Sequence, residues 1–177
     1  MSGIINSTGA KSGVIGTTVG SFDLTTATFP ADHIIKIESI IGSGNHDLSG
    51  VTAMTATGLK TSITFTAGNK ILVIAAIQVA SWGGGDDTGQ ILKLRDNTNS
   101  VDLSPIPYMY AAKGHSGSTE IDIESSMTLV SELYAPSGTT IEIELYQENP
   151  WSAGGAGTPV ARVNKSRSTL QLMEVQV

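Results

Sequence analysis

The chain has 177 residues, of which 40% are hydrophobic and 15% charged, and its net charge at pH 7 is −6. That length fits one domain with its own core, and the charged fraction lies below the roughly 25% usual for soluble domains. The negative charge argues against a nucleic-acid partner, because a protein that neutralises phosphates needs a cationic face. The absence of cysteine excludes disulfides, thiolate metal sites and cysteine nucleophiles.

Glycine, serine, threonine and the β-branched residues isoleucine and valine take the place of the missing charges. Long segments of alanine, leucine, glutamate and lysine, which favour helices, are absent. This composition is typical of strands and turns. We therefore expect an all-β chain with little or no helix.

Residues 1–20 contain five glycines and two isolated apolar pairs, Ile4-Ile5 and Val14-Ile15. Glycine at this density costs too much backbone entropy for a regular element unless another surface holds the chain. We predict an extended arm over residues 1–20, followed by a single body over residues 21–177. The start shows no signal peptide, and the longest apolar run is too short to cross a bilayer, so no membrane partner is expected.

The first strand of the body is predicted over residues 34–41, where Ile35, Ile37 and Ile41 share one face. Glycine and asparagine in residues 42–47 then predict a turn. Further strands are expected over residues 51–57, 62–66, 91–95, 121–124, 127–129 and 140–146.

The most apolar segment, residues 71–77, shows no alternation, so both faces of this strand are expected to be buried, in a sandwich interior or at a subunit interface. Residues 168–177 alternate with a change of phase between Leu172 and Met173, which indicates a bulge or a strand with two apolar faces. Either way, we expect the chain to end inside a sheet. The core and trimer contacts are assigned to Ile71, Val73, Ala75, Ile77, Leu172, Met173 and Val175.

Residues 140–146 form the clearest half-buried strand, with Glu142 and Glu144 expected to face water. A glycoside hydrolase would need paired carboxylates at a cleft, and this pair is the alternative that an enzyme would use. Residues 114–118 nearly match a nucleophile elbow but lack its last glycine and its strand-to-helix context. The histidines, which we expect to be exposed to solvent, are His33, His46 and His115. We predict no enzyme and no cofactor.

The glycine-rich residues 83–89 contain Asp86 and Asp87, which could gather oxygen ligands around calcium. A plain hairpin connection is the preferred interpretation, and no metal site is predicted. Aromatic side chains near loops can stack on sugar rings or anchor an interface, although packing is the commoner role. The possible ligand-binding residues are Trp82, Asp86, Asp87 and Trp151.

Eight to ten short strands joined by turns indicate a sandwich or a barrel. Three segments, residues 62–73 (SITFTAGNKILV), 90–96 (QILKLRD) and 168–175 (STLQLMEV), resemble small virion proteins of tailed bacteriophages, especially marine and cyanobacterial phages. The bodies of those proteins are similar to the trimeric jelly roll of the tumour-necrosis-factor and C1q superfamily. Residues 6–16 (NSTGAKSGVIG) are also similar to the start of such proteins. The resemblance implies an antiparallel jelly-roll sandwich that forms a homotrimer, with no catalytic residue to carry over.

We therefore expect a virion structural protein, made in the host cytoplasm and placed on the particle surface. In the leading hypothesis it is a capsid decoration, or cement, protein that trimerises and clamps neighbouring subunits of the major capsid protein, or of another virion component, through its arm. The anchoring residues would be Ile4, Ile5, Val14 and Ile15. The alternative is the knob of a tail or head fibre that binds a host surface glycan.

Overall fold

The computed structural model describes residues 31–82, 88–103, 108–111, 122–150, 158 and 160–177. Within these residues the chain forms strands and no helix, which confirms the all-β prediction. The strands are β1 (Ile34–Ile41), β2 (Asn45–Ser49), β3 (Thr52–Thr64), β4 (Lys70–Trp82), β5 (Thr88–Asp96), β6 (Val101–Asp102), β7 (Tyr108–Ala111), β8 (Asp122–Val130), β9 (Thr140–Asn149) and β10 (Val160–Val175).

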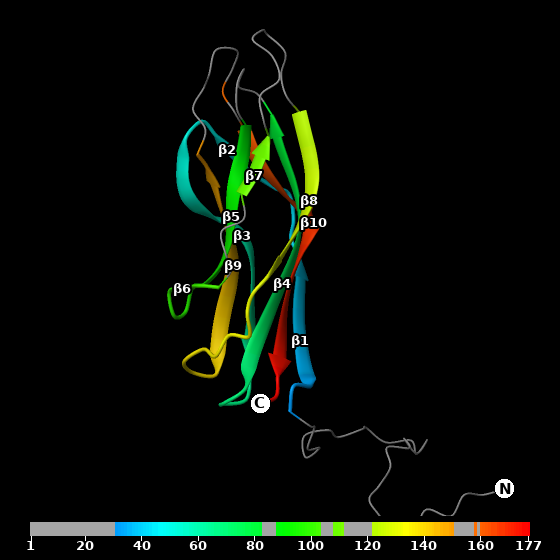
Figure 1. Ribbon diagram of the computed structural model, residues 1–177, viewed down its shortest axis with the longest axis vertical. Coiled ribbons are helices and arrows are strands. Elements are labelled where there is room, and N and C mark those ends of the chain that lie inside the picture. Colours follow the sequence, from blue (N-terminus) through cyan, green and yellow to red (C-terminus); the bar gives the residue numbers. More distant parts are fainter. Residues whose placement is uncertain (1–30, 83–87, 104–107, 112–121, 151–157, 159) are drawn as a thin grey trace, which may run out of the picture.

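The strands form two five-stranded antiparallel sheets that pack as a sandwich (Figure 1). Sheet A has the order β1-β10-β4-β8 with β2 also paired to β10, and sheet B has the order β3-β9-β5-β6 with β7 also paired to β5. From β3 to β5, and again from β8 to β10, successive strands alternate between the sheets. This crossing between sheets gives the predicted jelly-roll sandwich.

The core lies between the sheets and is made by alternate residues of the long strands, because side chains of a strand point to opposite faces in turn. Its fully buried members are Leu59, Ile63, Ile71, Val73, Ala75, Leu92, Leu94, Ile141, Ile143, Leu145, Val163, Leu170 and Leu172. Burial of each large aliphatic side chain contributes about 1.5–3 kcal/mol. The charge-poor composition is therefore matched by a continuous aliphatic core.

The part of the interior nearer to Trp82 contains buried polar side chains in addition to aliphatic ones. Gln90 and Gln147 are fully buried, and Gln147 Nε2 donates to Gln90 Oε1 at 2.9 Å. Gln90 Nε2 donates in turn to the carbonyl oxygen of Ala80 at 3.3 Å, and His46 Nδ1 lies 2.8 Å from Gln147 Oε1. The expectation that His46 lies exposed in a turn was wrong, because β2 pairs with β10 and carries this ring against sheet B.

The last strand differs from the prediction in its limits. β10 begins at Val160 rather than at Ser168, and it ends at Val175, leaving Val177 62% exposed. The change of phase produces a strand with two apolar faces, since Leu172 points into the core while Met173 points away from it. The irregular register of β10 against β4 lies earlier, between Asn164 and Thr169.

Candidate functional site

The outer face of sheet A is apolar along the part nearer the chain's carboxy terminus. Residues paired directly across neighbouring strands share a face, so the register defines rows of side chains. One row joins Ile37, Met173 and Leu72, and the next joins Ser39, Gln171, Ile74 and Val130. Taken together, the apolar members of four successive rows that reach solvent, named here the apolar face, are Ile34, Ile37, Ile41, Leu72, Ile74, Ala76, Val130 and Met173. Val175, which is paired with Ile34, is buried and is not counted among them.

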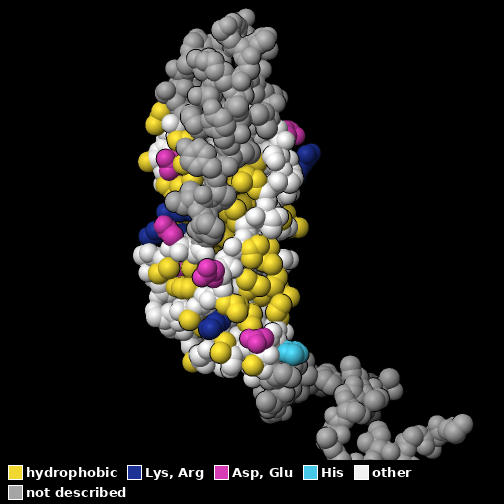
Figure 2. Space-filling model, in the orientation of Figure 1, with side chains coloured by type: hydrophobic (Ala, Val, Ile, Leu, Met, Phe, Trp, Pro, Cys, Tyr) yellow, Lys and Arg dark blue, Asp and Glu magenta, His cyan; other side chains and the backbone are white. Residues whose placement is uncertain are grey.

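These side chains meet solvent instead of packing within the chain. Ile37 is 55% exposed, Ile41 67% and Val130 49%. Figure 2 shows hydrophobic side chains gathered over the right-hand side of the lower half, where Figure 1 places β4, β10 and β1. Exposed apolar patches of this kind mark interaction sites on soluble proteins.

The apolar face carries no charge among its described residues except at one end. The rows that contain Ile37, Ser39 and Ile41 hold only apolar side chains, hydroxyls and one amide, that of Gln171. Lys70, paired with Val175 in the terminal row, is the one ionisable residue among the paired residues of the four rows. A surface without charge can be covered by another protein surface at little desolvation cost.

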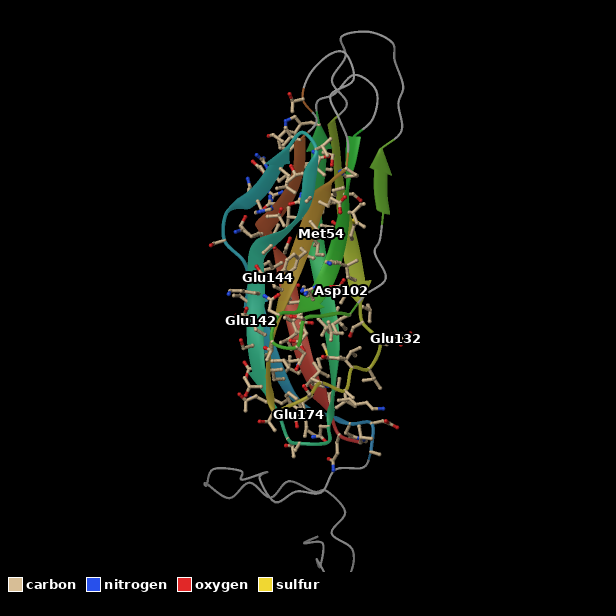
Figure 3. The ribbon with its side chains drawn as sticks, turned by 90° about the vertical axis from the view of Figure 1, so that its left-hand side faces the viewer. Met54, Asp102, Glu132, Glu142, Glu144 and Glu174 are labelled. Carbon is tan, nitrogen blue, oxygen red and sulfur yellow. The ribbon has the colours of Figure 1, made fainter. Side chains whose placement is uncertain are left out.

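The outer face of sheet B is charged by contrast. A row across β3, β9 and β5 joins Lys60, Glu144 and Arg95. Figure 3, with this side of the sandwich toward the viewer, shows Glu142 and Glu144 over β3 and β9. This part of sheet B therefore offers ion pairs to solvent, whereas the apolar face of sheet A offers aliphatic side chains.

The two glutamates of β9 are less open than the alternation predicts. Glu142 is partly exposed, but Glu144 is only 6% exposed. Asn97 Nδ2 donates to Glu142 Oε1 at 3.2 Å and to Glu144 Oε2 at 2.7 Å. The Asn97 amide, together with the Lys60 ammonium, holds the pKa of Glu142 below its usual value. The pair serves as an acceptor for neighbouring donors on a sheet face, and the expectation that both carboxylates face water was wrong for Glu144.

A second buried carboxylate closes the turn between β5 and β6. Asp96 is fully buried, and its Oδ1 accepts from the backbone nitrogens of Thr98 and Asn99 at 2.8 and 3.1 Å. Its Oδ2 accepts from Asn99 Nδ2 at 2.7 Å and from the Tyr134 hydroxyl at 2.9 Å. Burial, with the Asp96 carboxylate beside the ring, raises the pKa of Tyr134 to about 12.

We expect this hydroxyl to cause a loss of stability in alkali. The unfolded chain releases the Tyr134 proton near pH 10, whereas the folded chain holds it to about pH 12. The contribution of the Tyr134 hydroxyl to the free energy of unfolding is therefore full below pH 10 and is lost as the pH rises through 12. The free energy of unfolding, measured by urea titration at pH 8 and pH 11.5, should fall more between these pH values in the wild type than in Tyr134→Phe. Equal falls in the two proteins would contradict this.

The structure divides the predicted site residues into three groups. Those that point into the core, and so are not available for contacts between chains, are Ile71, Val73, Ala75, Ile77 and Leu172. Met173 lies on the apolar face, and Val175, on the same side, is only 4% exposed. Trp82 ends β4 and is partly exposed. The residues outside the described ranges are Ile4, Ile5, Val14, Ile15, Asp86, Asp87 and Trp151.

Sequence reasoning missed most of the apolar face. Leu72 and Ile74 lie between the core residues of the same run, and the lack of alternation over residues 71–77 was the signal for them. Ile37 and Ile41 share a face as predicted, but that face is turned outward, and Ile40 packs against the core instead. The register of β1 against β10 fixes this orientation, because it pairs Ile37 with Met173 on the outer face and Ile40 with the core residue Leu170.

Comparisons with known proteins identify no family. No family model matches the chain, and no curated protein matches it. Among solved structures, the C-terminal domain of EclA, a sugar-binding protein, is 15% identical with a TM-score of 0.36, over 86% of this chain and 89% of that one. The VP2 subviral particle protein of infectious bursal disease virus is 14% identical with a TM-score of 0.34, over 90% of this chain and 42% of VP2. Values this low assign neither a relationship nor a function.

Two absences among the described residues bear on the class of site. No helix in them has the length and apolar character needed to span a membrane. No cluster of three or more histidine, cysteine, aspartate or glutamate side chains in them could hold a metal ion. The apolar face is the feature on which a function can be built.

Proposed function

We propose that this chain is a structural subunit of a virus particle, a capsid decoration protein that assembles as a homotrimer through the apolar face and attaches to the shell through residues 1–20. The apolar face is the observation that supports the proposal. Ile34, Ile37, Ile41 and Val130, with the partly exposed members of the set, present roughly 500 Å² of apolar surface. That is a large part of the ~800 Å² that each partner buries in a standard interface.

A second copy of the chain is the partner that fits this surface. The net charge of −6 makes two copies repel each other, but the paired rows that form the apolar face contain no acidic residue, so contact between their side chains brings no carboxylates together. The charged outer face of sheet B then remains in water, where its ion pairs carry no desolvation penalty.

The position of the chain's entry into the body supports attachment through residues 1–20. The backbone nitrogen of Asp32 donates to the Gln176 carbonyl at 2.7 Å, and Gln176 donates to the His33 carbonyl at 2.9 Å. The chain therefore enters the sandwich beside its carboxy terminus, at the end opposite Trp82 (Figure 1). Attachment by residues 1–20 places the Trp82 end of the body away from the shell.

Removal of residues 1–20 is expected to abolish binding to particles and leave the trimer intact. The test compares co-sedimentation of full-length and truncated protein with particles assembled without this chain, alongside their masses in solution. The control is the full-length chain with serine at the anchoring positions Ile4, Ile5, Val14 and Ile15, which should bind no better than the truncated protein. Full occupancy by the truncated protein would contradict the role of these residues.

The second candidate function is the knob of a fibre that binds a host glycan, and the hollow beside Trp82 described below favours it. The two functions differ in copy number, because a decoration protein covers the shell and a fibre occupies few positions. Quantitative mass spectrometry of purified particles separates them. Hundreds of copies per particle would support decoration, and tens or fewer would support a fibre.

A further inference from the structure

A small hollow lies on the outer face of sheet A, at the opposite end from the apolar face. Ala80 of β4 is paired with Arg162 of β10 on one side and with Glu124 of β8 on the other, and Trp82 is the next residue of β4 on the same face. Because Ala80 is short and its neighbours are long, these four residues line an open depression with a volume of about 220 Å³.

Arg162 is held in place from two directions. Its Nε and Nη2 donate to Asp47 Oδ1 and Oδ2 at 2.7 and 2.8 Å, and its guanidinium lies over the Trp82 ring, 4.6 Å from the centroid. The ion pair lowers the pKa of Asp47 and raises that of Arg162, so both stay charged. A guanidinium fixed in this way keeps its remaining N–H groups at a defined position beside the hollow.

The charges around the hollow exclude several classes of ligand. Asp47 and Glu124 outnumber the one guanidinium, and Asp47 already occupies its paired donors, so an anion would meet net negative charge. A divalent cation would need three or more acidic or imidazole ligands, and no group of described residues supplies them. The lining combines one guanidinium donor with one carboxylate acceptor, which matches a neutral ligand whose hydroxyls can both donate and accept.

We propose that this hollow binds a single neutral pyranose unit of a glycan. A pyranose ring has hydroxyls at its rim, for which the Glu124 carboxylate accepts and the free Arg162 N–H groups donate, and C–H faces that pack against an indole and a methyl group such as those of Trp82 and Ala80. The depression, at about 220 Å³, is large enough for one such ring, and further units of a saccharide would extend into solvent.

This site goes beyond the proposed decoration function, which requires no ligand. The four residues of the hollow belong to the ends of β4, β8 and β10 that lie away from the carboxy terminus in Figure 1. None of them is part of the apolar face. Attachment by residues 1–20 would therefore leave the hollow facing outward. Binding of a sugar and self-association can be lost independently.

The test uses tryptophan fluorescence, since the chain contains two tryptophans and Trp151→Phe leaves Trp82 as the single reporter. The probes are the methyl α-pyranosides of glucose, galactose and mannose, titrated into the full-length protein. We expect at least one to change the Trp82 emission with a dissociation constant on the order of 1–10 mM, as a ligand of this size allows. Glucuronate should bind at least about tenfold more weakly because of its charge.

Two variants of the single-tryptophan protein test the geometry. Ala80→Leu fills the hollow and should abolish the fluorescence change, and Glu124→Gln, at an exposed position, should weaken binding about tenfold without affecting the fold. Saturation-transfer NMR on the same samples gives a readout that does not depend on Trp82. No response to any of the three pyranosides, equal binding of glucuronate, or unchanged binding in both variants would overturn the proposal. Sedimentation of the same samples reports separately on the trimer.

Discussion

Replacement of Ile37 and Ile41 by glutamate is expected to convert the proposed trimer into a monomer of 18.3 kDa that keeps its fold. Both side chains are more than half exposed in the single chain and face away from the core, so the change removes no intrachain packing of consequence. In the assembled protein it would bury two carboxylates without partners, which should raise the dissociation constant by about a thousandfold or more. Sedimentation equilibrium measures the mass, and far-UV circular dichroism measures the fold.

The matched control adds the same two charges to the other sheet, as Ala56→Glu/Thr64→Glu. Both residues are exposed, and their partners in the register, Tyr146 and Thr140, lie on the outer face of sheet B. This variant should remain a trimer, because in the proposal that face stays in water. Dissociation of both variants would show that added charge alone breaks the assembly, and a trimeric Ile37→Glu/Ile41→Glu protein would show that the apolar face is not the interface.

Replacement of Asp96 by alanine is expected to reduce the free energy of unfolding by about 3–5 kcal/mol. The carboxylate is fully buried and accepts four hydrogen bonds, so its removal leaves two backbone N–H groups and the Tyr134 hydroxyl without their acceptor. Urea denaturation at pH 7 measures the change.

The control for Asp96 is Asp102→Ala in the strand that follows the turn. Asp102 accepts from Lys93 Nζ and Arg95 Nη1, each at 2.9 Å, on the exposed face of sheet B, so its loss should cost about 1 kcal/mol or less. Similar losses in the two variants would mean that the buried network contributes no more than a surface ion pair. The free energy of unfolding of Asp96→Asn, which retains an acceptor for the backbone donors, should lie between those of the wild type and Asp96→Ala.

The predicted strands that match the structure best are those with a clear local pattern. Residues 140–146 alternate, and β9 covers them with Ile141 and Ile143 in the core. The turn predicted over residues 42–47 overlaps β2, because the pairing of Asn45–Ser49 with β10 joins residues more than a hundred positions apart in the chain. Local turn chemistry carries no information about such a distant partner.

The candidate sites show the same division. The apolar run over residues 71–77 indicated a strand with two apolar faces, but only the packing of sheet B against one of them shows that Val73 is core and Leu72 is surface. Of the hollow beside Trp82, the sequence indicated only Trp82 itself, as an aromatic residue near a loop. Its other walls, Arg162 and Glu124, come from strands that the register brings together.

By itself, the sequence determined the fold class, the absence of cysteine chemistry and the acidic charge, because these follow from composition and short-range periodicity. It also indicated a strand with two apolar faces at residues 71–77, whereas for residues 168–177 a bulge remained the alternative. Only the tertiary structure decided which of these faces the other sheet covers and which remains open, since that depends on register between distant strands. A shift of one residue in the register of a strand would have exchanged the two faces of that strand, and with them the residues that it gives to the core and to the proposed interface.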